Sequence, residues 1–407
     1  MFDPVTAELI GNAAPLPGLD PATLVDTLTT AYVEIAAARL QIGGSSGDQV
    51  RLGFAKLVQD MSRLADTYEA EIVLDVQQDH RRSMAFVAGS ARQVLGQIDR
   101  LVEREEHPTL LDGMAIGAEI AAALLFLIAE RSSDAYEASR DIRAAGETNP
   151  IRRALILSVG RFARGQFEEL DSIVLEDERS TSTDPIETAV DVMYRELLRS
   201  LIILARVGLG LNGRRSIETA REIFDGVARA AVSTHSYELS SLAPPLRTTS
   251  VFGGPFHLAS LLSKAIDGFE NSMLVLLPTP AGAAPEQWKE WLRSEAGRWP
   301  FLWENHRDAV ATGYLDRGAS LVMTTPTGSG KSTLATLKIV ATLAGGKTVV
   351  YLAPTHALVS QIEDDLNKRL VSIAKVQSVE NMGLNETVQS LPDVAVVTPE
   401  RCFALLT

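Results

Sequence analysis

Apolar residues recur every three or four positions through the first part of the chain, up to about residue 240. One such pattern follows Asp20-Pro21, where an aspartate cap and a proline at the first helical position are typical of a helix start. Leu24, Leu28 and Tyr32 then fall on one face of the helix. The pattern predicts an amphipathic helix that buries this face.

The same start signals recur further along the chain. Asn149-Pro150 and Asp184-Pro185 each open another apolar run of helical spacing. Glu187 stands where it can reach back to the N–H of the cap residue and complete a capping box. Because the alternation typical of strands is scarce here, residues 1–240 are expected to form an α-helical domain.

The pattern changes from about residue 301. An apolar strand is predicted at Ser320–Thr324, a helix at Lys331–Leu343 and a buried strand at Thr348–Leu352. A second helix is predicted at His356–Leu370 and a third strand at Val394–Val397. Strands that alternate with helices predict a parallel sheet with crossover helices, so this part is expected to be an α/β domain.

A proline-rich segment separates the two patterns. Residues 278–285 hold three prolines and a glycine, which cannot form a regular element. The sequence therefore divides into a helical domain at 1–240, a connector at 241–300 and an α/β domain at 301–407.

All four tryptophans lie after this linker, in the sixteen residues 288–303. Trp288 and Trp291 are three positions apart and share one face of a short predicted helix. We interpret them as a local aromatic core that docks the helical part onto the next domain. The alternative is that Trp303 or Phe301 lines a pocket for adenine.

Charge is placed unevenly along the 407 residues, whose formal net charge is −14. Of the 38 basic and 52 acidic residues, 9 and 10 lie in residues 301–407, so the first 300 residues carry a net charge of −13. Phosphate binding depends on Lys and Arg, so any contact with nucleic acid is expected in the last quarter, or in local basic patches that the net charge hides.

Other classes of protein are disfavoured by composition. The longest apolar run, Ile120–Ala129, is half of the roughly 20 residues that a membrane span needs, so it predicts a buried core helix. The lone Cys402 excludes a disulfide within the chain. No signal peptide is recognised at the start, so a cytoplasmic protein without membrane contact is expected. Few lysines among many Arg and Ala residues fit a bacterial source.

A glycine-rich loop lies between the first predicted strand and the following helix, which is the context that a phosphate-binding loop requires. Its glycines permit the turns that aim backbone N–H groups at phosphates, at the positive end of a helix. Lys331 would supply charge to the β- and γ-phosphates, and Ser332 a hydroxyl to Mg²⁺. The alternative is a chance match, since Thr325 replaces the usual first glycine. The loop consists of Thr325, Pro326, Thr327, Gly328, Ser329, Gly330, Lys331, Ser332 and Thr333.

Three segments together resemble superfamily 2 helicases of the DEAD/DEAH-box type. Residues 326–332, Pro-Thr-Gly-Ser-Gly-Lys-Ser, resemble motif I. Residues 354–361, which begin Pro-Thr-His, are similar to motif Ia with His356 in the usual arginine place. Residues 398–401, Thr-Pro-Glu-Arg, resemble motif Ib. The resemblance covers about residues 301–407 and implies a RecA-like fold.

The resemblance also implies functional roles. Motif I would bind ATP with Mg²⁺, and Lys331 and Ser332 would be its catalytic residues. Motifs Ia and Ib would grip the backbone of single-stranded DNA or RNA without reading its sequence. Their residues here are Pro354, Thr355, His356, Thr398, Pro399, Glu400 and Arg401. For Thr398-Pro399, a plain helix start is an alternative or additional interpretation.

His306 occupies the place where related helicases carry a glutamine that reads the edge of adenine. A neutral imidazole offers one donor and one acceptor, fewer groups than an amide. A contact to the adenine of ATP and a purely structural histidine are therefore both open.

A helicase motor also needs a second acidic motif, Asp-Glu-x-His or Asp-Glu-x-Asp, and a second motor domain. The one Asp-Glu pair, Asp177-Glu178, lies in the helical part. We therefore expect the N-terminal piece of a longer helicase, which binds nucleotide without turning it over and uses its helical domain for regulation or a protein partner. The alternatives are a non-hydrolysing nucleotide-binding scaffold and a P-loop ATPase that does not unwind nucleic acid.

Overall fold

The computed structural model describes residues 2–41, 52–74, 80–103, 109–174, 184–237, 246–324, 330–371, 373–380 and 391–406. The chain divides into two compact units, residues 1–272 and 273–407. The division falls inside the segment 241–300 that the sequence suggests is a connector. The division into three parts stays a prediction.

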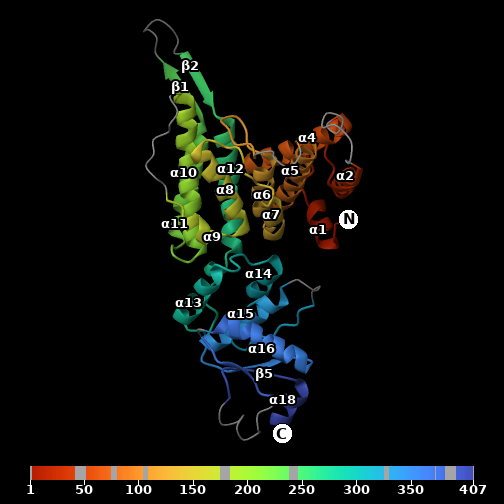
Figure 1. Cartoon of the computed structure of the whole chain (residues 1–407), viewed down its shortest axis with the longest axis vertical. Helices are drawn as coiled ribbons and strands as arrows, with labels where there is room; N and C mark the ends of the chain where they lie inside the picture. The colour runs from red at the N-terminus through yellow and green to blue at the C-terminus, as the bar shows by residue number, and fades with distance from the viewer. Residues whose placement is uncertain are drawn as a thin grey trace. The chain divides into compact units, whose positions relative to one another are not determined.

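The first unit is an assembly of helices that carries one β-ribbon (Figure 1). Its described helices are α1 (Pro4–Gly11), α2 (Pro21–Gln41), α4 (Ala55–Leu74), α5 (Arg81–Glu103), α6 (Ala118–Ile128), α7 (Ser132–Ser139), α8 (Pro150–Arg164), α9 (Phe167–Asp171), α10 (Pro185–Gly208), α11 (Arg215–Ala231) and α12 (Gly253–Ser272). The three helices predicted from cap-and-proline signals are α2, α8 and α10.

Strands β1 (Val232–Tyr237) and β2 (Leu246–Val251) join α11 to α12 as an antiparallel ribbon, with Val232 opposite Val251. Residues 232–237 thus form a strand within the segment 1–240 that is expected to be an α-helical domain. Val, Thr and Tyr favour strands, and pairing with β2 along the whole of β1 stabilises the strand here.

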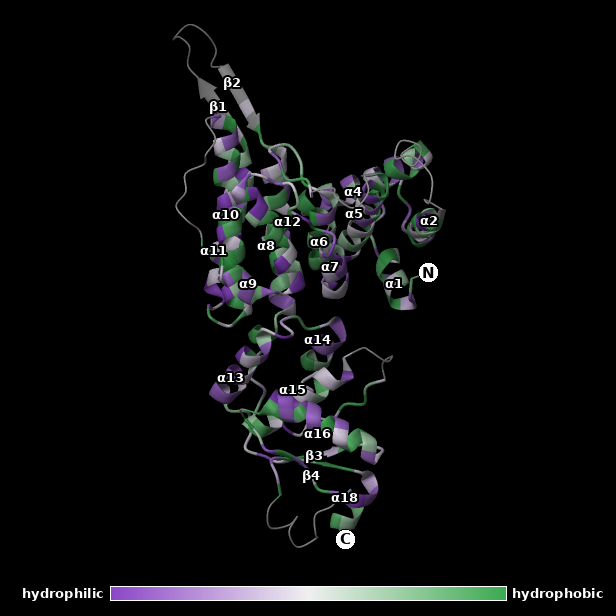
Figure 2. Cartoon of the chain, viewed as in Figure 1, coloured by the Kyte–Doolittle hydropathy of each residue, from purple (hydrophilic) through white to green (hydrophobic). Residues whose placement is uncertain are grey.

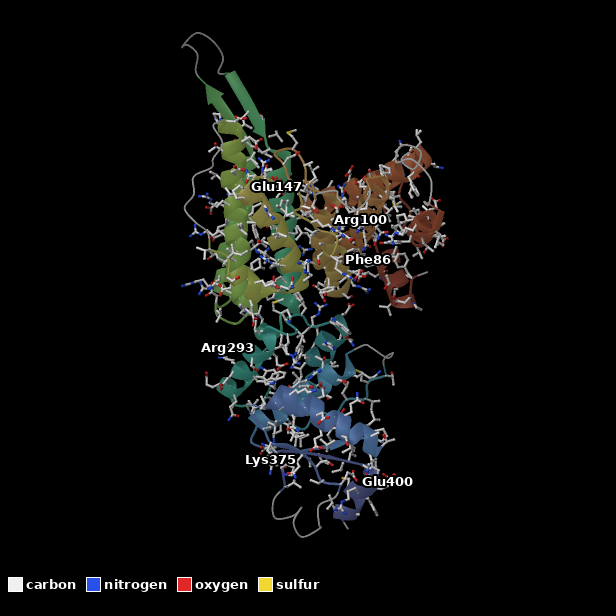
Figure 3. All side chains as sticks on the ribbon, in the orientation of Figure 1. Phe86, Arg100, Glu147, Arg293, Lys375 and Glu400 are labelled. Carbon is white, nitrogen blue, oxygen red and sulfur yellow. The ribbon has the colours of Figure 1, made fainter. Side chains whose placement is uncertain are left out.

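Helix α6 is the centre of this unit. All of its residues from Glu119 to Ile128 are buried, as the apolar run in the sequence predicts. Phe86 of α5, labelled in Figure 3, lies 5.5 Å from Phe126 of α6 between ring centroids. On another side Gly268 of α12 faces α6 so closely that a Cβ there would lie 2.2 Å from the Leu127 carbonyl oxygen. Close packing on several sides explains why α6 is apolar all round.

The outer helices are amphipathic. Figure 2 shows hydrophilic and hydrophobic residues alternating around α10 and α11. At the start of α10 the Asp184 side chain accepts from the Ile186 N–H at 2.9 Å, as predicted. The Glu187 carboxylate makes a charge-assisted hydrogen bond with Arg152 of α8. None of the described helices is long and apolar enough to cross a membrane.

The second unit is an α/β domain. Its described elements are the 3₁₀ helix η2 (Leu274–Leu276), α13 (Pro285–Ala296), α14 (Glu304–Ala311), α15 (Lys331–Ala344), β3 (Val349–Leu352), α16 (His356–Leu370), β4 (Val376–Ser378), β5 (Val394–Val397) and α18 (Pro399–Leu406). The sheet order is β3-β5-β4 and both pairings are parallel. The predicted fold class, a mainly helical region followed by an α/β domain with a parallel sheet, is confirmed.

One predicted strand is absent from the described structure. Residues 320–324 run outside any strand, and the Val322 side chain is 91% exposed. A strand needs a neighbour to pair its backbone groups, and among the described residues β3 pairs with β5 alone. An apolar sequence alone is therefore not sufficient to form a strand at residues 320–324.

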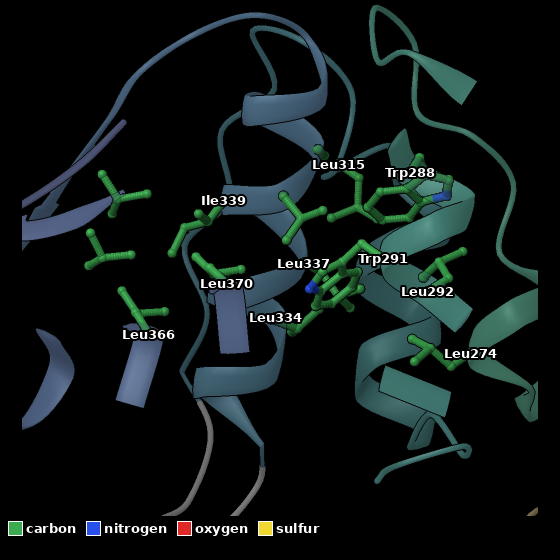
Figure 4. Packing of buried hydrophobic residues seen from close by; sticks show 14 of the residues in the cluster. Leu274, Trp288, Trp291, Leu292, Leu315, Leu334, Leu337, Ile339, Leu366 and Leu370 are labelled. Atoms are coloured by element: carbon green, nitrogen blue, oxygen red, sulfur yellow. The ribbon is translucent and has the colours of Figure 1, made fainter. Parts of the chain in front are cut away.

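Trp288, Trp291 and Trp299 contribute to the core of the second unit, whereas Trp303 is 40% exposed. Trp288 and Trp291 of α13 are fully buried and pack in one cluster with Leu334 and Leu337 of α15 (Figure 4). The Trp299 indole N–H donates to Glu295 at 2.6 Å. These tryptophans therefore pack against α15 inside the α/β unit, and their role in docking the helical part stays a prediction.

Candidate functional site

The first element of the site is the start of α15. Gly330 is the residue before the helix and has φ +77°, a left-handed conformation that glycine adopts without strain. Its carbonyl accepts from the Thr333 N–H at 2.9 Å, the first hydrogen bond of the helix. The backbone N–H groups of Lys331 and Ser332 precede that bond, and both residues are exposed. Such a helix start favours an anion.

The predicted phosphate loop is described only in its second part. Thr325, Pro326, Thr327, Gly328 and Ser329 lie outside the described residues, whereas Gly330, Lys331, Ser332 and Thr333 are described. In the described part Gly330 is left-handed and Lys331 begins α15, and phosphate binding by the loop stays a prediction.

His306 of α14 packs directly on this junction. Its Nδ1 accepts from the Trp303 N–H at 3.3 Å, so the hydrogen-bond network assigns the ring hydrogen to Nε2. Nε2 then donates to the Gly330 carbonyl at 3.1 Å. The ring is 3% exposed and lies parallel to the Trp303 indole, with 5.5 Å between centroids. Both ring nitrogens thus have structural partners, and a contact from His306 to adenine stays a prediction.

The chain between α14 and the loop is tied to the same helix. The Lys338 ammonium of α15 donates to the carbonyls of Tyr314 and Asp316 at 2.7 and 2.8 Å. Burial lowers the pKa of Lys338, while the nearby Asp316 carboxylate opposes that shift. These contacts fix the approach to the loop from one side.

The second element of the site is the carboxyl edge of the sheet. Leu352, the last residue of β3, is opposite Val397, the last residue of β5. Because these strands are parallel, the segments that follow them emerge side by side. Those segments are the ones that resemble motifs Ia and Ib, so the fold brings together two stretches that are some forty residues apart in sequence.

The residues that resemble motif Ia form the start of α16. Thr355 caps the helix, because its hydroxyl accepts from the Leu358 N–H at 3.3 Å. Pro354, Thr355 and His356 are all exposed. A capped helix start with exposed polar residues can contact a phosphate.

The residues that resemble motif Ib form the start of α18. Thr398 is buried, and its hydroxyl accepts from the Arg401 N–H at 3.4 Å. Pro399 and Glu400 are exposed, whereas Arg401 is half-buried and its Nε donates to the Val379 carbonyl at 3.3 Å. The helix start expected as one interpretation of Thr398-Pro399 is present.

Glu380 is a site residue that the sequence analysis missed. It follows β4, a three-residue strand that was not predicted. Its carboxylate accepts from the Thr398 N–H and lies 3.4 Å from His356 Nδ1. Val376 and Val379 are the apolar residues of this stretch, and two such positions are too few to identify a strand.

A groove of about 590 Å³ opens beside the start of α15. Ser332 and Thr336 of α15, Tyr351 of β3, and Gln361 and Asp365 of α16 contribute to its wall. Burial, together with the Asp365 carboxylate, raises the pKa of Tyr351. Ser332 therefore lines a groove whose wall includes a phenol that stays neutral near physiological pH. Among the described residues no group of three or more His, Cys, Asp or Glu side chains could hold a metal.

Residues 304–407 match the family model of the DEAD/DEAH box helicases. The resemblance recognised from three short motifs is thus confirmed for this part of the chain, which matches a DEAD/DEAH box helicase domain. The match includes His306, the start of α15, Glu380 and both motif segments. The match does not cover residues 1–303, so it concerns the second unit alone. No curated protein matches the chain in a sequence comparison.

Proposed function

We propose that the second unit is the ATP-binding part of a superfamily 2 helicase or translocase that acts on single-stranded nucleic acid. The observation that carries the proposal is the start of α15, where a left-handed Gly330 precedes two exposed residues, Lys331 and Ser332. Backbone N–H groups, an ammonium and a hydroxyl in one helical turn are the groups that bind phosphate and its magnesium ion.

In this proposal each group has a distinct role. The N–H groups before Thr333 and the Lys331 ammonium hold the β- and γ-phosphates, and the Ser332 hydroxyl orients Mg²⁺. Bound Mg²⁺ would neutralise charge on the phosphates. The sequence holds no Asp-Glu-x-His or Asp-Glu-x-Asp, so we propose that residues 1–407 bind ATP without turning it over.

The strand would cross the carboxyl edge of the sheet. Thr355 and His356 start one helix there, and Thr398 and Arg401 belong to the start of the next. Hydroxyls, N–H groups and a guanidinium are typical phosphate contacts that carry no sequence information. A non-hydrolysing scaffold would need no such contacts, so strand binding discriminates between the two functions.

The test is equilibrium binding of labelled single-stranded DNA and RNA over a range of salt concentrations. Arg401→Ala is expected to weaken binding. It should also reduce the slope of the logarithm of the binding constant against the logarithm of salt concentration by about one. Lys375→Ala is the matched control, because Lys375 precedes β4 and so lies at the opposite edge of the sheet from Glu400 (Figure 3). Equal salt slopes for the two variants would remove Arg401 from the phosphate contacts.

A further inference from the structure

The carboxylate of Glu380 is placed where the proposed strand-binding groups converge. It is 9% exposed at the carboxyl edge of the sheet. One oxygen accepts from the Thr398 N–H, and the other lies 3.4 Å from His356 Nδ1. It therefore bridges the start of α16 and the segment between β5 and α18.

Both partners of Glu380 belong to the proposed phosphate contacts. A carboxylate and a backbone phosphate are both anions that accept hydrogen bonds, so they suit the same donors. One N–H cannot serve both at full strength, and two anions in one place repel each other. Glu380 and a strand phosphate are therefore competitors for the Thr398 N–H.

The backbone around Glu380 is held without its carboxylate. Glu363 of α16 accepts from the Ser378 N–H at 2.8 Å. Arg401 donates to the Val379 carbonyl at 3.3 Å, and β4 pairs with β5. Because three other contacts fix this segment, folding does not demand an acidic side chain at position 380.

We propose that the Glu380 carboxylate occupies the place of a strand phosphate, and that a bound single strand displaces it. The inference rests on the proposed function of the same edge. Glu380 is then an internal competitor. It weakens binding of the nucleic-acid strand and speeds release of the bound strand. A residue that only braced α16 and α18 would have the opposite effect when removed.

The order of affinities among variants separates these two roles. Glu380→Ala removes the competitor, and Glu380→Gln keeps an acceptor oxygen without the charge. Competition predicts the tightest binding for the alanine variant, then the glutamine variant, then the unmodified chain. We expect a gain of about tenfold for Glu380→Ala, since a charge-assisted hydrogen bond no longer has to be broken. Bracing predicts weaker binding for alanine and little change for glutamine.

The experiment is fluorescence anisotropy of a labelled single-stranded oligonucleotide with the full 407-residue chain, as DNA and as RNA. Glu286→Gln is the control, because it changes net charge equally at an exposed position on α13. Circular dichroism establishes that each variant is folded. If the unmodified chain binds and both Glu380 variants bind equally or less tightly, this inference falls while the proposed function stands. If no variant binds, including Glu380→Ala, both fall.

Discussion

The imidazole of His306 fills the space that a side chain at position 330 would need. Nε2 lies 3.1 Å from the Gly330 carbonyl oxygen, and a Cβ on residue 330 would lie 2.2 Å from Nε2. The histidine and the glycine are therefore matched across 24 residues of sequence. This pair fixes the backbone at the point where α15 begins and where the proposed phosphate contacts start.

Gly330→Ala is expected to destabilise the second unit. The left-handed conformation costs a side chain about 1–2 kcal/mol, and overpacking against His306 adds about 1–3 kcal/mol. All four tryptophans lie in this unit, so tryptophan fluorescence during urea unfolding reports on it selectively.

Gly346 is the matched control at the other end of α15. It has φ +67°, and a Cβ added there would meet no atom within 4 Å, so Gly346→Ala carries the conformational cost alone. Equal destabilisation by the two substitutions would show that contact with His306 contributes nothing.

Close packing of α12 on α6 gives a second prediction, in the helical unit. Gly268→Ala places a methyl group 2.2 Å from the Leu127 carbonyl oxygen and should cost about 1–3 kcal/mol in the free energy of unfolding. Gly226→Ala on α11 meets no atom within 4 Å and should stabilise by about 0.5–1 kcal/mol. Circular dichroism during thermal unfolding measures both, and a neutral Gly268→Ala would contradict the packing.

Acid stability should depend on Glu69. Burial raises the pKa of this carboxyl, but hydrogen bonds from His257 and Arg92 outweigh burial and hold it below its ordinary value of 4.5. The charged form is thus favoured in the folded state, so the stabilisation is present above pH 4.5 and is lost as the pH falls through the lowered pKa. Glu69→Gln should cost about 3–5 kcal/mol near neutral pH, and the difference from the unmodified chain should shrink in acid.

Glu137 provides the comparison for Glu69. Its side chain is 63% exposed and pairs with Arg140 on the same surface of α7. Glu137→Gln should leave the unfolding free energy within about 0.5 kcal/mol at every pH, since exposed pairs contribute little. A pH-independent difference for Glu69→Gln would contradict the assigned role of its charge.

The sequence predicts an element well where the signal is local. Helix α16 begins and ends as predicted because Thr355 caps it and basic residues close it. Strand β5 is predicted at its observed bounds because it is buried on both faces and reads as a continuous apolar run. The phosphate loop is recognisable for the same reason, since its residues are contiguous.

Features that depend on distant partners are not visible in the sequence. Strand β4 has three residues and exists through its pairing with β5, so Glu380 could not be placed beside Thr398. The contact of His306 with Gly330 likewise needs the fold. At residues 320–324 the sequence instead predicts a strand that is not observed, because this apolar run has no pairing partner among the described residues.

The central claim is that ATP binds at the start of α15, and isothermal titration of Mg-ATP into the full chain tests it most directly. Lys331→Ala should weaken binding by about tenfold or more, because it removes a charged phosphate contact. Lys347→Ala removes the same charge from an exposed residue just beyond the other end of α15 and should bind ATP as the unmodified chain does. Unchanged affinity in Lys331→Ala, or no ATP binding by the unmodified chain, would contradict the account.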